Sequence, residues 1–359
     1  MPLSSHLLHF GLKNPSRSGR VRSDLDLAKH NQPKPAPPCL LDEMSASDSA
    51  AMSVQKVESL ELAEGRQMLN LGCGRQFHPA WVNVDLVPIN QSVCKVDISR
   101  GLPFSDNRFD AIYHSHLLEH LDHNQGQMLI GECFRALKPG GILRIVVPDL
   151  EQIARLYLDF HQQAVAGNKV AAANYRWMKL ELFDQMVRRQ SGGSMGRYIS
   201  DPTSPNQNFV RQRLGDEIQN CLADKASDFG AAPTDKTGLG SSTPIQPTYA
   251  SEGSMWYRLR LRLAMWLVRR LLGRSARQAL QEGLFRAKGE IHRWMYDQFS
   301  LTELCQQFGF ENLRVCSAWE SQIENFVEFQ LDTERDRVRK PDSIFFECRK
   351  PVSDYRFLS

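Results

Sequence analysis

The sequence predicts an α/β protein with a Rossmann-like, doubly wound and mostly parallel sheet of seven strands. Short apolar segments alternate with helical ones between residues 68 and 147, and a glycine turn follows the first apolar segment. The run Ile-Leu-Arg-Ile-Val-Val at 142–147 is continuously apolar except for one arginine, as in a strand buried on both faces. Alternation of strands and helices favours a parallel sheet, because each helix returns the chain to the same edge.

The first predicted strand runs into the turn Gly72-Cys73-Gly74. Glycines let the backbone turn tightly and approach a ligand with no Cβ in the way. The second predicted strand ends at Asp85, eleven residues after Gly74. A carboxylate at that place accepts hydrogen bonds from both hydroxyls of a ribose. The pattern predicts a site for an adenosine-containing cofactor.

The turn disfavours a dinucleotide. NAD and FAD sites have a third glycine where Phe77 stands, so that the helix packs closely beside the pyrophosphate. A nucleoside cofactor without phosphates does not need that approach. Asp97 and Ile98 end a third predicted strand, where an acid can bond the adenine amino group and an apolar residue can cover the ring.

A fourth predicted strand, 107–113, leads into His114-Ser115-His116-Leu-Leu-Glu119-His120. A predicted helix over 124–137 is stopped by Lys-Pro-Gly-Gly at 138–141, just before the run at 142–147. Polar groups that follow the fourth strand lie at the carboxyl edge of the sheet, where folds of this kind place their ligands.

The ordered set of these segments resembles the class I S-adenosylmethionine-dependent methyltransferases of type 11, and among them bacterial members found near surface-polysaccharide genes. The resemblance covers 67–149, resumes near 292–297 and 300–310, and ends with a last strand at 339–347. It implies S-adenosylmethionine as the cofactor. It also implies a set of residues that contact it: Asn70, Gly72, Cys73, Gly74, Asp85, Leu86, Asp97, Ile98, His114 and Ser115.

The sequence departs from this family at two points. Asn70 stands where the family often has an acid, and an amide cannot pair with the cofactor's amino group as a charge. The segment between Gly74 and Val82 is short, so the helix after the first strand is predicted to be brief or absent.

Composition excludes several classes of protein. The chain has 359 residues with 42% hydrophobic and 24% charged residues, as in a soluble globular protein. Its net charge of +3 is too small to indicate a nucleic-acid partner. The eight cysteines are scattered, with no C-x-x-C, which suits a reducing, cytoplasmic compartment. No apolar run approaches the ~20 residues that span a membrane.

The predicted organisation has five parts. Residues 1–54 form a disordered tail, 55–150 the cofactor-binding core, 151–290 a helical insertion, 291–350 the completion of the core, and 351–359 a tail. Within the insertion, 223–254 is a flexible loop. The apolar residues of 150–190, among them Trp177 and Phe183, favour helices that pack against the sheet, with a cap over the cofactor as the alternative.

Residues 255–280 predict a basic amphipathic helix. Arginines and apolar residues, two of them tryptophans, fall on different sides of it, and no acid lies between Gly253 and Gln281. Such a helix suits peripheral contact with an anionic membrane, here the inner face of the cell membrane. A helix packed on the core with solvated arginines is the equally weighted alternative.

The candidate catalytic residues are His114, His116, Glu119 and His120, of which one would remove a proton from an acceptor hydroxyl. They also match the zinc-peptidase pattern H-x-x-E-H. That pattern requires both histidines on one long helix, whereas here it follows a strand, so we expect no metal.

His292 and Tyr296 are weaker candidates on the acceptor side, and Trp294 is predicted to be core. The favoured function is O-methylation of a glycan or lipid-linked sugar. The alternatives are an inactive binding protein of a glycan pathway and, more remotely, an NAD-dependent oxidoreductase. Oligomeric state is not predicted.

Overall fold

The computed structural model describes residues 66–215, 218, 255–287 and 289–352. The predicted tail 1–54 and loop 223–254 lie outside the described residues, as does the tail 351–359 beyond residue 352.

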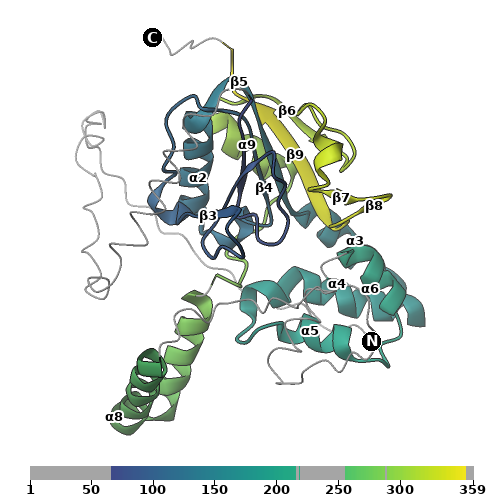
Figure 1. Ribbon diagram of the computed structural model, residues 1–359. Coiled ribbons are helices and arrows are strands. Elements are labelled where there is room, and N and C mark those ends of the chain that lie inside the picture. Colours follow the sequence, from purple (N-terminus) through teal and green to yellow (C-terminus); the bar gives the residue numbers. More distant parts are fainter. Residues whose placement is uncertain (1–65, 216–217, 219–254, 288, 353–359) are drawn as a thin grey trace, which may run out of the picture. The chain divides into compact units, whose positions relative to one another are not determined.

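The core is a seven-stranded sheet in the order β3-β2-β1-β4-β5-β9-β6 (Figure 1). Its strands are β1 Met68–Leu71, β2 Val82–Asp85, β3 Val93–Lys95, β4 Phe109–Ser115, β5 Leu137–Pro148, β6 Glu311–Cys316 and β9 Ser343–Arg349. Strands β1 to β5 are parallel, and β9 runs antiparallel to both β5 and β6. The predicted mostly parallel sheet is confirmed.

Two helices cover one face of this sheet, α2 His123–Ala136 and α9 Gln298–Gln307 (Figure 1). Apolar residues of both helices share one buried cluster with the strands, including Leu129 and Ile130 of α2 and Leu301 of α9. A capping box of Asp122 and Gln125 starts α2. After α2 the chain enters β5 directly at Leu137, so the predicted helix stop at 138–141 is the start of a strand.

The opposite face is covered by the segment after β6. Ala318, Ile323, Phe326 and Leu331 pack there against residues of the sheet such as Tyr113. This segment includes the 3₁₀ helix η3 Phe326–Phe329. Among the described residues no helix lies between β1 and β2, which confirms the prediction from the short segment.

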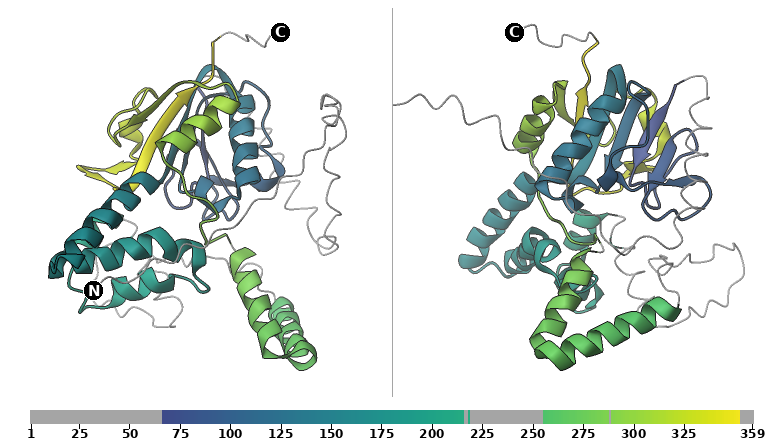
Figure 2. Two further views of the ribbon diagram at one scale, coloured as in Figure 1. Left: turned by 180° about the vertical axis from the view of Figure 1, so that it is seen from behind. Right: turned by 90° about the vertical axis from the view of Figure 1, so that its left-hand side faces the viewer.

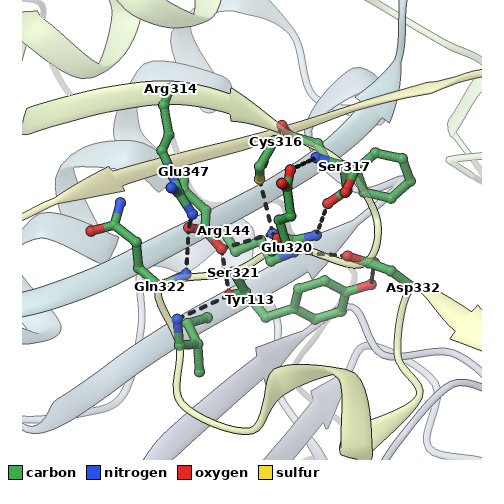
Figure 3. A network of polar contacts seen from close by, with 12 residues as sticks. Tyr113, Arg144, Arg314, Cys316, Ser317, Glu320, Ser321, Gln322, Asp332 and Glu347 are labelled. Carbon is green, nitrogen blue, oxygen red and sulfur yellow. Dashed lines mark hydrogen bonds and ion pairs between the residues drawn. The ribbon is translucent and has the colours of Figure 1, made fainter.

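An arginine is buried beneath this cover. Arg144 on β5 pairs with Asp332 and with Glu347 of β9, each at 2.7 Å, and the hydroxyl of Tyr113 donates to Asp332 at 2.6 Å (Figure 3). The guanidinium also stacks on Phe326, 4.5 Å from the ring centre. Two acids and an aromatic ring thus replace water around a fully buried cation.

The insertion begins with four helices, α3 Leu150–Val165, α4 Lys169–Val187, α5 Gly193–Ser200 and α6 Gln207–Leu214. They have a core of their own, in which Trp177 and Met178 are fully buried. The expected packing of Trp177 against the sheet is therefore wrong, and Phe183 is 51% exposed. A buried pair of Glu181 and Arg213, 2.7 Å apart, joins α4 to α6.

Helix α8, Met255–Ala287, is bent at Gly273, where φ is 89° and ψ is −174° (Figure 2). Large apolar side chains along it are solvent-exposed, among them Trp256, Trp266 and Leu271 at 65%, 59% and 76%. No described helix is long and apolar enough to cross a membrane.

The remaining elements are small. They are the 3₁₀ helices η1 Ile98–Arg100 and η2 Leu118–His120, and the two-stranded sheet of β7 Thr333–Glu334 and β8 Arg337–Val338.

Candidate active site

The glycine turn after β1 has the backbone shape that the sequence predicted. Gly72 and Gly74 have φ values of 60° and 51°, in the left-handed region that favours glycine. A Cβ on Gly72 would lie 2.8 Å from Cδ1 of Leu117, in the turn after β4. Around Gly74 no described atom lies within 4 Å of the Cβ position. The turn is therefore packed on one side and open on the other.

Asp85 fastens this turn to the end of β2. Its Oδ2 accepts from the backbone N–H of Gly74 at 2.9 Å, and its Oδ1 accepts from that of Val87 at 2.9 Å. A carboxylate has about four lone-pair sites, so two are left for a ligand. Leu86, beside it, is 56% exposed. These positions fit a ribose held at the carboxyl ends of β1 and β2.

Asn70 is buried behind the turn. Its amide nitrogen donates to the carbonyl of Gln76 at 2.9 Å and to Oδ1 of Asn83 at 3.1 Å. These bonds hold the segment between β1 and β2 in the absence of a helix there. The side-chain N–H groups of Asn70 already donate within the fold, so they are not available to the cofactor. The cofactor contact of Asn70 stays a prediction.

Cys73 is also buried, between the two glycines. Burial raises the pKa of its thiol to about 12, so the thiol stays protonated at neutral pH. A protonated thiol is a poor nucleophile, so we interpret Cys73 as a small residue that fits the turn.

Asp97 and Ile98 lie after β3 at the same edge of the sheet. Asp97 caps η1 by accepting from the N–H and hydroxyl of Ser99 at 3.1 and 2.6 Å. Its side chain is 40% exposed and pairs with Arg100 at 3.3 Å. Ile98 packs against the main core. An adenine would meet a partly exposed acid at this place.

His114, near the end of β4, is fully buried. Neither ring nitrogen has a hydrogen-bond partner among the described residues. Burial lowers the pKa of this imidazole to about 3, because removal from water disfavours the charged form. Its catalytic role stays a prediction. For that role the ring, which is fully buried here, would have to become accessible to the acceptor. Ser115, the next residue, is half-buried.

His116 links three parts of the fold. It has a φ of 52°, and its Nε2 lies 2.8 Å from Oγ of Ser343 on β9. Its Nδ1 lies 3.3 Å from Oε1 of Glu119. Burial lowers the pKa of the imidazole well below its usual range. The lowered pKa favours a neutral ring, whose Nε2 is in hydrogen-bond contact with the Ser343 hydroxyl and whose Nδ1 lies beside the Glu119 carboxylate.

Glu119, His120 and His292 form a compact cluster beside it. One ligand atom from each lies within 4.8 Å of the others. The two imidazoles are nearly perpendicular, with centres 4.9 Å apart. Burial lowers the pKa of His292. Three of the four predicted catalytic residues, His116, Glu119 and His120, thus lie within one short turn, whereas His114 lies on β4. His292 and Ser343 join the turn from elsewhere in the chain.

Of these two, the sequence marked His292 weakly and missed Ser343. The serine follows an acid at the start of a strand and carries no pattern of its own. Tyr296 is buried, and burial raises the pKa of its hydroxyl. Trp294 was wrongly predicted as core: it is 43% exposed and lies beside His123.

The sheet order is that of a Rossmann-like fold, and the glycine turn and Asp85 lie where such folds hold a nucleoside cofactor. Residues 75–145 match the model of the type 11 methyltransferase family, described as a methyltransferase domain. This segment runs from the glycine turn into β5. The chain therefore carries a methyltransferase domain of the S-adenosylmethionine-dependent class.

The solved structures that match the chain do so at low sequence identity and low TM-score. A Thermotoga maritima S-adenosylmethionine-dependent methyltransferase, described as a possible histamine N-methyltransferase, has 13% identity and a TM-score of 0.30, over 83% of this chain and 88% of that one. A Bacillus halodurans putative methyltransferase has 13% identity and a TM-score of 0.29, over 83% of this chain and 98% of that one. A Haloferax volcanii complex of a methyltransferase activator and a putative methyltransferase has 17% identity and a TM-score of 0.21, over 30% of this chain and 54% of that one. No curated protein matches the chain.

Proposed function

We propose that the protein transfers a methyl group from S-adenosylmethionine to a hydroxyl of a glycan or lipid-linked sugar. The observation that carries the cofactor half is the open glycine turn at Gly74, which Asp85 holds through a 2.9 Å hydrogen bond. The bound cofactor supplies a methyl group already activated by a positively charged sulfur. The protein's task is to align the acceptor with it and to exclude water.

Transfer to a hydroxyl needs a place for one proton. The new oxygen–methyl bond forms as the methyl–sulfur bond breaks, S-adenosylhomocysteine leaves, and the hydroxyl proton passes to a base. Among the four predicted candidates, His116 has the arrangement of an oriented base, with Glu119 beside one ring nitrogen and the Ser343 hydroxyl at the other. The acceptor proton would pass to the Ser343 oxygen as the serine's own proton passes to Nε2 of His116. Its side chain is 12% exposed, whereas His114 is fully buried.

The glycan or lipid-linked acceptor is supported by the resemblance and by α8. This helix contains eight arginines and one glutamate. Its tryptophans and several leucines are exposed, as the membrane alternative requires and the packed alternative does not. Exposed tryptophans beside arginines suit the interface of an anionic bilayer. We infer that the protein works at the inner face of a membrane, where lipid-linked sugars are available.

Calorimetric titration of the purified full chain with S-adenosylhomocysteine tests the cofactor, with NAD as the parallel control. We expect micromolar binding of the first and none of the second. Binding of neither by a folded sample would favour an inactive binding protein. Transfer of labelled methyl from the cofactor to extracted bacterial glycolipids, against the same extract with its hydroxyls blocked by acetylation, then tests the acceptor.

Sedimentation with liposomes tests the membrane contact. The intact chain should sediment with vesicles containing anionic phospholipid and not with neutral ones, and less so at high salt. A chain lacking 255–280 should stay in the supernatant with both. An intact chain that does not sediment would remove the membrane from the proposal and leave the cofactor half untouched.

A further inference from the structure

We propose that Glu119, His120 and His292 bind a divalent transition-metal ion such as Zn²⁺, through one carboxylate and two imidazoles. Their potential ligand atoms all lie within 4.8 Å of one another. Ions of this kind, whose ligands are about 2.0–2.2 Å from the metal, are commonly held by imidazole nitrogens and carboxylate oxygens.

His120 has the second contact that metal-binding histidines usually make. Its Nδ1 lies 3.1 Å from the backbone carbonyl of Ile291, to which it can only donate a proton. This bond fixes the tautomer and leaves Nε2 as the lone-pair atom, which faces the metal in most histidine sites.

His292 provides a second observation that supports a bound metal ion, separate from the spacing of the three residues. The residue is 4% exposed, and its Nδ1 is buried with no hydrogen-bond partner among the described residues. A buried polar atom without a partner is costly, so such atoms are rare unless a ligand meets them. A metal ion shared with Glu119 and His120 would satisfy it.

The backbone holds the three residues in place. The carbonyl of Glu119 accepts from the N–H groups of Arg293 and Trp294 at 2.7 and 3.2 Å. The N–H of His292 donates to the carbonyl of Gln185 at the end of α4. The η2 turn, the segment that carries His292 and the insertion therefore meet at fixed distances, as a metal site requires.

The residues around the three ligands also have defined contacts. His116 lies 3.3 Å from the Glu119 carboxylate and is itself held by Ser343 at 2.8 Å. Arg188 and Lys340 are the cations that act on His292. Arg188 is paired with Glu290 at 3.4 Å, which reduces its repulsion of a bound cation.

This site is not the zinc-peptidase pattern in the sequence. His116 has a left-handed backbone and η2 spans only Leu118–His120, so His116 and His120 do not share a helix. The cluster instead takes its third ligand, His292, from beyond the insertion. The expectation of no metal considered that pattern, its place in the cofactor-binding series and the scattered cysteines, and not a ligand from beyond the insertion.

The ion's role rests on the proposed function. Three protein ligands leave coordination positions open, as in catalytic zinc sites. An acceptor hydroxyl bound there would lose its proton more easily, because a metal ion lowers the pKa of a bound oxygen. Glu119 and His120 follow shortly after Ser115, which the resemblance includes among the residues that contact the cofactor.

The test is a Co²⁺ titration of the chelator-treated full chain, followed by visible absorption, with Zn²⁺ as competitor. We expect one equivalent with a low-coordinate spectrum that Zn²⁺ abolishes. His292→Gln and, separately, His120→Gln should weaken binding at least tenfold. His123→Gln is the matched control, because His123 is exposed on the first turn of α2 and lies outside the cluster.

Equal Co²⁺ binding by His292→Gln, His120→Gln and the unaltered chain would overturn the proposal, as would no binding by the unaltered chain. Calorimetry with S-adenosylhomocysteine on the same metal-free sample separates the two proposals. If the nucleoside binds and Co²⁺ does not, only the metal site falls. If Co²⁺ binds and the nucleoside does not, the metal site stands and the methyltransferase proposal falls.

Discussion

Asp85 has two tasks that act on the same few atoms. It holds the turn through Gly74 and Val87, and it offers its remaining lone pairs to a ribose. A carboxylate pinned by backbone N–H groups is pre-organised, so little freedom is lost when the ligand arrives. The residue is therefore the most direct test of the cofactor site.

Asp85→Ala should weaken S-adenosylhomocysteine binding by about 1–3 kcal/mol, because hydrogen bonds to a charged group are lost. Calorimetry of the folded variant measures this. Asp159→Ala, which removes an exposed acid from α3, is the control and should bind as the unaltered chain does. Unchanged affinity in Asp85→Ala would contradict the ribose role.

His114 predicts a dependence of stability on pH. Its pKa is about 3 in the folded chain against 6.5 for the ordinary side chain, so the unfolded chain binds the extra proton. The stability from keeping this ring neutral is fully present above pH 6.5 and is lost as the pH falls toward 3. The loss should reach about 1.4 kcal/mol per pH unit for one proton.

His114→Leu removes this proton site and should flatten the fall in unfolding free energy between pH 6 and 4, measured by urea unfolding. His116 and His292, whose pKa values are also lowered by burial, keep part of the slope. Identical slopes in His114→Leu and the unaltered chain would show that His114 becomes charged without unfolding.

At the scale of elements, one face of the sheet is covered by helices and the other by the segment after β6. The segment after β6 covers Arg144. The backbone carbonyls of Ser317 and Glu320 in this segment accept from the Arg144 guanidinium at 3.2 and 2.9 Å (Figure 3). A buried arginine with two acids makes the position of the segment specific, because any shift leaves charges without partners.

Arg144→Met should lower the unfolding free energy by about 3–5 kcal/mol, because Asp332 and Glu347 would stay buried without their cation. Urea unfolding at neutral pH measures it. Arg314 also pairs with Glu347, at 3.2 Å, but its side chain is 43% exposed. Arg314→Met should therefore cost about 1 kcal/mol or less. Equal losses in the two variants would mean that the buried network contributes no more than a surface pair.

At the scale of the whole molecule, the sequence predicts the elements of the fold that depend on local residue patterns. The strands from β1 to β5, the helix α2 and the missing helix after β1 all follow from runs of apolar residues, glycines and segment length. Their order alone sets a parallel sheet with its ligand edge at Gly74, Asp85 and the end of β4.

What the sequence could not show depends on contacts between distant segments. Ser343 meets His116 only because β9 inserts beside β5, and His292 meets His120 only because the chain returns after α8. The insertion was misread for the same kind of reason: helical spacing in α4 says that one face is buried, but not against what. Trp177 is buried among the insertion's own helices.

We expect the sheet and the insertion to unfold together. Leu150 donates to Tyr296, and His292 donates to Gln185, so backbone hydrogen bonds cross between α3 or α4 and the segment before α9. A ligand bound at the glycine turn should then stabilise α3 to α6 as well. At a concentration 100 times its dissociation constant, S-adenosylhomocysteine should add about 2.7 kcal/mol to the unfolding free energy.

Urea transitions followed by far-ultraviolet circular dichroism and by tryptophan fluorescence check this. Both should coincide and move together with the nucleoside, and neither should move with NAD. In Asp85→Ala a tenfold loss of affinity should reduce the gain at the same concentration to about 1.4 kcal/mol. If the circular dichroism transition split into two parts and the nucleoside moved only one of them, the insertion would be an independent folding unit, because its helices would unfold without regard to the occupied turn.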